Sequence, residues 1–167
     1  MTVNNEETMN TPMRAMLLLV LSAGLVAYAF AGDPAPNFKL STIDGKTIEL
    51  KQLAGKAVVV NFWATWCGPC RREIPGMVKI YQKYKAKGLE IVGISLDRGG
   101  WDDVKPFLAK NPIAYTIVVG GREIAEAYGG IEGIPTSFFV DRKGNIVSKT
   151  VGSMPEEEFE NAVKKIL

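Results

Sequence analysis

The apolar side chains of this chain recur at spacings that predict strands alternating with helices. Residues 58–62 form an apolar run typical of a buried central strand, and residues 91–96 form a second strand. Between them, residues 69–87 carry apolar side chains at helical spacing, and Gly88 supplies a stop. A strand, a helix and a strand in this order predict that the two strands pair in parallel.

The pattern on either side of this unit predicts a larger sheet. Residues 38–40 and 47–50 flank the turn dipeptide Asp44-Gly45 and predict a β-hairpin, and residues 50–53 predict one helical turn. Further along, we expect helices over residues 101–110, 122–128 and 155–167, and strands over residues 115–119, 137–140 and 146–151. The last two strands predict an antiparallel hairpin, so the predicted fold class is α/β, with a mixed sheet flanked by helices.

An uncharged apolar run, residues 15–31, precedes all of these elements. As a helix it would be about 25 Å long, which is within the range for one membrane span. The run also ends in Ala29-Phe30-Ala31, the small-x-small form of a signal cleavage site, so a cleaved secretory signal is the alternative. The length of the run and the acidic residues before it favour an uncleaved anchor over a cleaved signal. A core helix is the least favoured of the three interpretations.

These patterns predict one exported domain behind a membrane segment. We expect a cytoplasmic tail (residues 1–14), a transmembrane anchor or signal segment (15–31), a linker (32–36) and an α/β domain (37–167). An uncleaved segment predicts a single-pass protein of the cell membrane, with its domain on the extracytoplasmic (periplasmic or outer) side. Cleavage predicts a secreted or periplasmic protein instead.

The amino-acid composition limits the kinds of partner and of catalysis that this chain can support. The formal net charge of +2 over 167 residues is too small to argue for a nucleic-acid partner. Histidine is absent, which excludes Cys-His and Ser-His catalysis, and two cysteines cannot build a four-ligand zinc site. We therefore predict neither a metal nor a cofactor, and a redox pair is the favoured interpretation of the two cysteines.

Cys67 and Cys70 are placed at the start of the helix that follows the central strand. One turn separates them, so the two sulfurs can close a small disulfide ring with one cysteine accessible and the other shielded. The free N–H groups and the dipole of the helix N-terminus stabilise a thiolate, which is the species that attacks disulfides. A purely structural disulfide is disfavoured because a loop this short contributes little stability.

The active-site stretch resembles a known family. Residues 62–70 (Phe-Trp-Ala-Thr-Trp-Cys-Gly-Pro-Cys), Glu73 and the segment Gly133-Ile134-Pro135-Thr136 are similar to the thioredoxin superfamily, and more narrowly to its TlpA/ResA-like branch of membrane-anchored or secreted thiol:disulfide oxidoreductases. The resemblance covers most of residues 36–167. It implies a thioredoxin-like mixed sheet, and the assignment to this branch rests also on the predicted N-terminal β-hairpin, a central insertion at residues 96–111 and the N-terminal apolar segment.

The resemblance also implies a role for each site residue. Cys67 would be the attacking cysteine and Cys70 the resolving one, together forming a redox-active disulfide. Ile134-Pro135 resembles the cis-proline that faces the cysteines and lets the preceding residue's backbone pair with a substrate chain. Trp66 would cover the site and touch substrate.

Glu73 is the candidate proton acceptor. Thioredoxin itself has a buried acid on the central strand, and this chain has Asn61 there instead. ResA-like proteins carry a glutamate three residues after the second cysteine, which Glu73 matches, and this spacing puts Cys70 and Glu73 on one helix face. A solvated helix carboxylate is the alternative for Glu73, and Thr65 is expected to cap the helix.

The implied activity is reduction of disulfides in cysteine-containing exported proteins, such as apocytochrome c during cytochrome c biogenesis. The Gly68-Pro69 dipeptide favours the reducing direction, and an upstream membrane thiol-disulfide electron donor is implied as a second partner. Two alternatives remain. A peroxiredoxin-like thiol peroxidase requires proline and threonine where this chain has Val60 and Ala64, and a copper-handling module of this fold would resemble CxxxC plus histidine.

Overall fold

The computed structural model describes residues 32–167, of which residues 33–167 form one compact unit. The predicted tail and the predicted anchor or signal segment, residues 1–31, lie outside the described residues. Among the helices of residues 32–167, none combines the length and apolar character needed to cross a membrane.

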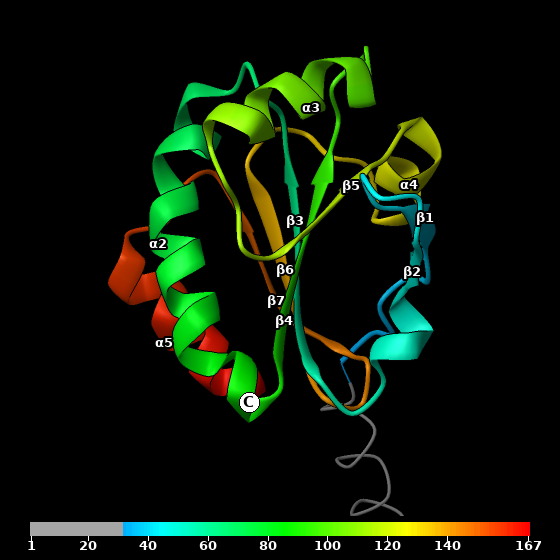
Figure 1. Cartoon of the computed structure of the whole chain (residues 1–167). Coiled ribbons are helices and arrows are strands. Elements are labelled where there is room, and N and C mark those ends of the chain that lie inside the picture. Colours follow the sequence, from blue (N-terminus) through cyan, green and yellow to red (C-terminus); the bar gives the residue numbers. More distant parts are fainter. Residues whose placement is uncertain (1–31) are drawn as a thin grey trace, which may run out of the picture. The chain divides into compact units, whose positions relative to one another are not determined.

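A five-stranded mixed sheet forms the centre of this unit (Figure 1). Its parallel part runs through the central strand β3, and two antiparallel strands complete it on one side. The strand order across the sheet is β5 (Thr116–Val119), β4 (Leu89–Ser95), β3 (Ala57–Trp63), β6 (Thr136–Val140) and β7 (Ile146–Val151). The predicted thioredoxin-like mixed sheet is therefore confirmed.

Strand β3 is buried along its whole length, and its side chains alternate between the two faces of the sheet. Val58, Val60 and Phe62 join one apolar cluster, whereas Val59 and Trp63 join the other. By the same alternation, Asn61 points to the face of Val59 and Trp63. One polar side chain therefore enters the interior at the middle of an otherwise apolar strand face.

Helices cover the Asn61 face of the sheet, as Figure 1 shows on its left side. The longest, α2 (Gly68–Tyr84), packs through Met77 and Ile80, and α5 (Glu156–Ile166) packs beside it. Helix α3 (Trp101–Lys110) adds Val104 to the same cluster. Because α2 begins directly beyond the carboxyl end of β3, this face carries the cysteines.

The opposite face is covered by smaller elements. They are the hairpin of β1 (Lys39–Ser41) and β2 (Thr47–Glu49), the 3₁₀ turn η1 (Leu50–Leu53) and the short helix α4 (Arg122–Ala127). The predicted N-terminal hairpin and helical turn are thus confirmed. The predicted helix over residues 69–87 divides into α2 and a 3₁₀ turn, η2 (Lys85–Lys87), which ends at Gly88 with a positive φ of 92°.

The end of the sheet away from the cysteines is tied together by backbone and side-chain bonds. Arg142 in the turn between β6 and β7 donates to the carbonyl oxygens of Leu167, Lys87 and Gly55. The first described residues also attach here, since the Ile146 N–H donates to the Asp33 carbonyl at 2.8 Å. The chain thus enters the domain at the end of the sheet remote from the redox pair.

Candidate active site

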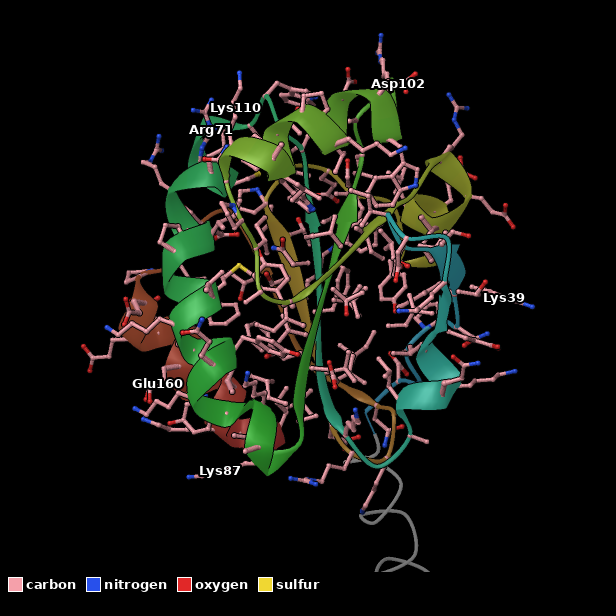
Figure 2. All side chains as sticks on the ribbon, in the orientation of Figure 1. Lys39, Arg71, Lys87, Asp102, Lys110 and Glu160 are labelled. Carbon is pink, nitrogen blue, oxygen red and sulfur yellow. A yellow bond between two sulfur atoms is a disulfide. The ribbon has the colours of Figure 1, made fainter. Side chains whose placement is uncertain are left out.

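Cys67 and Cys70 form a disulfide at the start of α2, with their Cα atoms 5.3 Å apart (yellow bond in Figure 2). Cys67 is the N-cap residue, and its Sγ accepts the Cys70 backbone N–H at 3.2 Å. The exposed fractions of the two residues are 5% and 1%. Cys67 is therefore the more accessible of the two, and a helix N–H already points at its sulfur.

The Ile134–Pro135 peptide bond is cis and lies against the disulfide. The carbonyl oxygen of Ile134 is 3.6 Å from the Sγ of Cys67, although the two residues are far apart in the sequence. The Thr136 hydroxyl donates to the Gly133 carbonyl at 2.6 Å and holds the loop that carries this bond. The structure thus brings together the two segments on which the family resemblance rests.

The two tryptophans of the motif lie in opposite environments. Trp66 is 69% exposed, next to Cys67, whereas Trp63 is buried and packs against Phe107 with ring centroids 5.5 Å apart. Trp66 is therefore a large apolar side chain exposed to solvent beside the disulfide. Trp63 belongs to the core, as its position on the strand predicts.

Glu73 is half-buried on α2 and is contacted by neutral donors. The Asn61 amide donates to the Glu73 carboxylate at 3.3 Å and to the Ser137 hydroxyl at 3.0 Å. Burial raises the pKa of Glu73 to about 7, against the opposing effect of the Asn61 amide and the Met154 backbone N–H. A carboxyl group with a pKa in this range can both accept and release a proton at neutral pH.

Asp97 is the site residue that the sequence reasoning missed. Its buried carboxylate accepts the Thr65 N–H at 3.0 Å, the Thr65 hydroxyl at 2.6 Å and the Ser95 hydroxyl at 2.6 Å. The expectation that Thr65 caps α2 was wrong, because Cys67 is the N-cap and the Thr65 side chain binds Asp97 instead.

Strand register explains this contact. Trp63 at the end of β3 pairs in parallel with Ser95 at the end of β4, so the residues that follow the two strands emerge side by side. The signal in the sequence was an aspartate directly after a predicted strand, with a serine at the end of that strand. Asp97 thereby fixes the loop that leads into the cysteines.

The described residues suit thiol chemistry better than metal binding. Within residues 32–167, no group of three or more histidine, cysteine, aspartate or glutamate side chains is arranged to hold a metal ion. The two sulfurs lie together beside the Ile134 carbonyl oxygen, and the Glu73 carboxyl group, of raised pKa, belongs to the same helix. This arrangement can carry out thiol–disulfide exchange with proton transfer.

Comparison with known proteins places this arrangement in a family. A family model described as the AhpC/TSA family matches residues 31–149. The thiol-disulfide oxidoreductase ResA of Bacillus anthracis is 39% identical over 165 residues, which cover 92% of this chain and 94% of the relative. ResA of Bacillus subtilis is 33% identical, with 89% of each chain covered.

Solved structures agree in fold. A putative thiol:disulfide interchange protein DsbE from Chlorobium tepidum superposes with a TM-score of 0.76 at 37% identity, covering 81% of this chain and 96% of that one. StoA from Bacillus subtilis gives a TM-score of 0.66 at 29% identity, with 77% and 98% covered. The chain therefore belongs to the AhpC/TSA family, with a thioredoxin-like fold and close similarity to thiol-disulfide oxidoreductases of the ResA type.

Proposed function

We propose that this chain is an extracytoplasmic protein-disulfide oxidoreductase that works in the reducing direction. The observation that carries the proposal is the Cys67–Cys70 disulfide at the N-terminus of α2, beyond the carboxyl end of the central strand and against the Ile134 carbonyl. The similarity to proteins named thiol-disulfide oxidoreductase supports the same activity.

The reaction transfers two electrons from the cysteine pair to a client disulfide. The Cys67 thiolate attacks one client sulfur, the client S–S bond breaks, and the departing client thiolate takes up a proton. The Cys70 thiolate then attacks the Cys67 sulfur of the mixed disulfide and releases the second client thiol. The products are a reduced client and the Cys67–Cys70 disulfide present in this structure.

Cys67 suits the attacking role for electrostatic reasons. As the N-cap of α2, its sulfur lies at the positive end of the helix dipole and accepts a backbone N–H. Both interactions are stronger with a thiolate than with a neutral thiol. Cys70 is more deeply buried and is therefore suited to resolving a mixed disulfide rather than to starting one.

Glu73 suits the role of proton acceptor for the resolving cysteine. It lies three residues after Cys70 on the same helix, and its raised pKa leaves it partly deprotonated at neutral pH. Resolution needs the Cys70 thiol to lose a proton, and a carboxylate of this pKa can take it without holding it permanently.

Client contact would involve Trp66 and the backbone of Ile134 beside Pro135. Trp66 projects into solvent and Ile134 places its carbonyl beside Cys67, so an extended client strand entering here meets both. Backbone pairing with such a strand does not depend on the client's side chains, so it can serve clients of different sequence.

The N-terminal sequence and the relatives support a setting outside the cytoplasm. Residues 15–31 would anchor the protein as a single membrane span, with residues 1–14 cytoplasmic and the domain from residue 37 outside. We propose cysteine-containing exported proteins as clients, apocytochrome c among them. Electrons would come from a membrane thiol-disulfide donor, because an exported dithiol must be reduced again after each turnover.

Thiol peroxidase and copper handling are less well supported. The positions where peroxiredoxin-like proteins carry proline and threonine are occupied by Val60 and Ala64, both fully buried, so no hydroxyl is available there. The described residues also offer no histidine to complete a copper site.

Redox titration combined with client trapping tests the proposal. The reduction potential of the Cys67/Cys70 pair should lie well below the value of about −120 mV that marks strongly oxidising enzymes. The Cys70→Ala variant should retain a client as a mixed disulfide on Cys67, and Cys67→Ala, its matched control, should retain none. A potential near −120 mV would overturn the reducing direction, and equal trapping by both variants would overturn the role of Cys67.

A further inference from the structure

The groove between α2 and α3 is positively charged and carries no carboxylate. It is a cavity of about 830 Å³ whose cationic side chains are Arg71, Arg72 and Lys110, and none of its lining residues is acidic. Apolar side chains complete its wall, among them Val78, Phe107 and Pro112. The α2–α3 groove therefore combines an apolar surface with three positive charges.

The α2–α3 groove begins at the redox pair. Gly68, which directly follows Cys67, is one of its lining residues, and the Arg71 backbone N–H donates to the Cys67 carbonyl at 3.1 Å. The guanidinium of Arg72 folds back over this end, with its Nη1 3.5 Å from where a Cβ on Gly68 would lie. A polypeptide with its disulfide at Cys67 thus has neighbouring residues within reach of these charges.

The three cations have no ionic partner in the described part of the chain. Lys79 and Lys83, later on α2, pair with Glu156 and Glu160 of α5, whereas Arg71, Arg72 and Lys110 form no ion pair within residues 32–167. Figure 2 shows Arg71 and Lys110 close together at the edge where α2 begins and α3 ends. Exposed cations grouped without counter-charges favour an anionic partner.

We propose that the α2–α3 groove binds an acidic client segment adjacent to the target disulfide. The inference rests on the proposed function and adds the chemistry of the client: aspartate or glutamate within a few residues of the reactive cysteine, together with an apolar side chain. Carboxylates would bind Arg71, Arg72 and Lys110 through charge-assisted hydrogen bonds. The apolar side chain would pack against Phe107 and Pro112.

This arrangement selects clients mainly by the rate of encounter. Charges at the rim of an interface steer a partner of opposite charge, and salt screens the effect over about 10 Å at 0.1 M ionic strength. The groove lies beside Cys67 and acts on the approach and binding of the client segment rather than on the S–S bond itself. Discrimination should therefore appear in kcat/KM and should weaken as salt is added.

A pair of matched disulfide peptides tests the proposal with the full-length protein in detergent. The peptides share one sequence, except that glutamates beside the disulfide in the first are glutamines in the second. The reduced protein should reduce the glutamate peptide about 5- to 10-fold faster in kcat/KM at low salt, as expected for a few exposed charge pairs. The ratio should approach one at high salt.

Charge-removing variants locate the effect. The combined variant Arg71→Gln, Arg72→Gln, Lys110→Gln should bring the ratio of the two peptides close to one. Lys110→Gln alone, which changes a residue on α3 outside the active-site helix, should lower the ratio of the two kcat/KM values only partially. The control Lys39→Gln, on the hairpin at the far side of the molecule in Figure 2, should leave the ratio at its wild-type value.

The possible failures are distinguishable. Equal reduction of both peptides by the wild-type protein would overturn the groove proposal and leave the reductase intact. A preference that survives in the triple variant would place the selectivity elsewhere and also overturn it. A protein that reduces neither peptide would contradict the proposed function itself.

Discussion

Two carboxyl groups lie near opposite ends of helix α2, one on the helix itself and one on α5, and their environments shift their pKa values in opposite directions. Glu73, near the cysteines, has a pKa raised to about 7, mainly by burial, because only the Asn61 amide and a backbone N–H oppose it. Glu160, on α5, meets the other end of α2 and has a pKa lowered to about 2.

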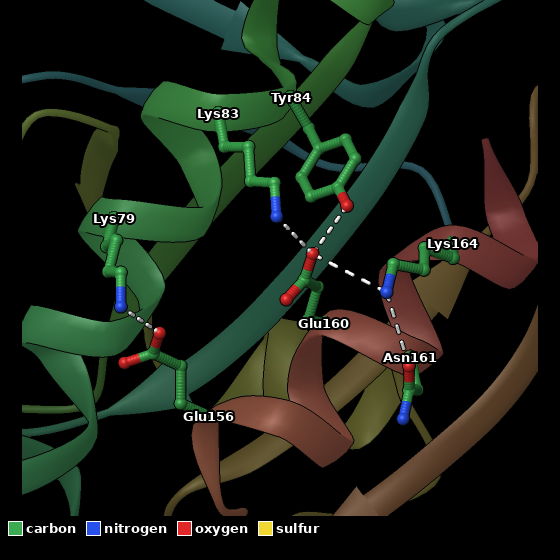
Figure 3. Close-up of polar contacts among 7 residues, drawn as sticks. All are labelled: Lys79, Lys83, Tyr84, Glu156, Glu160, Asn161 and Lys164. Atoms are coloured by element: carbon green, nitrogen blue, oxygen red, sulfur yellow. Dashed lines mark hydrogen bonds and ion pairs between the residues drawn. The ribbon is translucent and has the colours of Figure 1, made fainter.

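The lowered pKa of Glu160 results from a cluster of donors that Figure 3 shows. Its carboxylate accepts from Lys83 Nζ at 2.7 Å and from the Tyr84 hydroxyl at 2.5 Å, and Lys164 Nζ lies 3.5 Å away. Lys79 and Glu156 form a second ion pair between the same two helices at 2.6 Å. This end of α2 is therefore joined to α5 by ion pairs.

The difference shows how one helix serves two purposes. A carboxylate among cations is permanently charged and useful for attaching two helices. A buried carboxylate with neutral donors titrates near neutral pH and is useful for moving protons. The cysteines lie at the end of α2 that carries the second kind.

The largest expected effect comes from removing the titrating group at the redox end. Glu73→Gln should slow disulfide exchange about 100-fold, the lower end of the usual contribution of a general base, because the Cys70 thiol loses its proton acceptor. The wild-type rate should rise around pH 7 as Glu73 loses its proton, and this rise should be absent in the variant. Stopped-flow rates of peptide-disulfide reduction from pH 5 to 9 measure both.

The folding stability of the same variant tests whether its loss of rate comes from lost proton transfer rather than from misfolding. With a folded pKa of about 7 against an ordinary 4.5, Glu73 holds its proton more tightly in the folded state, so the unfolding free energy of the wild type should fall from pH 4.5 to 7. Glu73→Gln should lack this fall and remain folded. An unchanged pH–rate profile in a folded variant would contradict the proton-transfer role.

A smaller effect is expected from the amide that faces Glu73. Asn61→Ala removes a donor that favours the charged carboxylate, so the pKa of Glu73 should rise further and the midpoint of the pH–rate profile should move to higher pH. Ser137→Ala is the matched control, because it removes the other partner of the amide without touching Glu73. A downward shift in Asn61→Ala would refute this assignment.

The smallest expected effect on catalysis comes from the other end of the helix. Glu160→Gln should destabilise the fold at neutral pH and leave the exchange rate unchanged. With a folded pKa of about 2 against an ordinary 4.5, the Glu160 carboxylate stabilises the fold above pH 4.5, and this contribution is lost as the pH falls from 4.5 through 2. Denaturant unfolding of both proteins at pH 7 and pH 3 should show the difference shrinking in acid.

These results would show that the two ends of α2 act independently, one in catalysis and the other in stability. Glu73→Gln should change the rate and remove the fall in stability between pH 4.5 and 7, whereas Glu160→Gln should leave the rate unchanged and lower stability at neutral pH more than in acid. A loss of exchange rate in Glu160→Gln would show that the ends of the helix are coupled.

The sequence by itself determined the elements and the reactive pair. Apolar spacing and turn residues are local properties, so the strands, the long helix before Gly88 and the hairpin around Asp44-Gly45 followed from them. The Trp-Cys-Gly-Pro-Cys stretch at a strand–helix junction identified Cys67 and Cys70 in the same way, since both lie in one short segment.

Only the tertiary structure decided what surrounds that pair. The Asn61 amide donates a hydrogen bond to Glu73, and the Asp97 carboxylate accepts one from Thr65. The Ile134 carbonyl oxygen lies close to the Cys67 sulfur. All three contacts form because strand register and helix packing bring together segments far apart in the sequence. Glu73 and Glu160 are the same residue type, each on a helix. Local sequence therefore could not show that burial would raise one pKa and neighbouring cations lower the other.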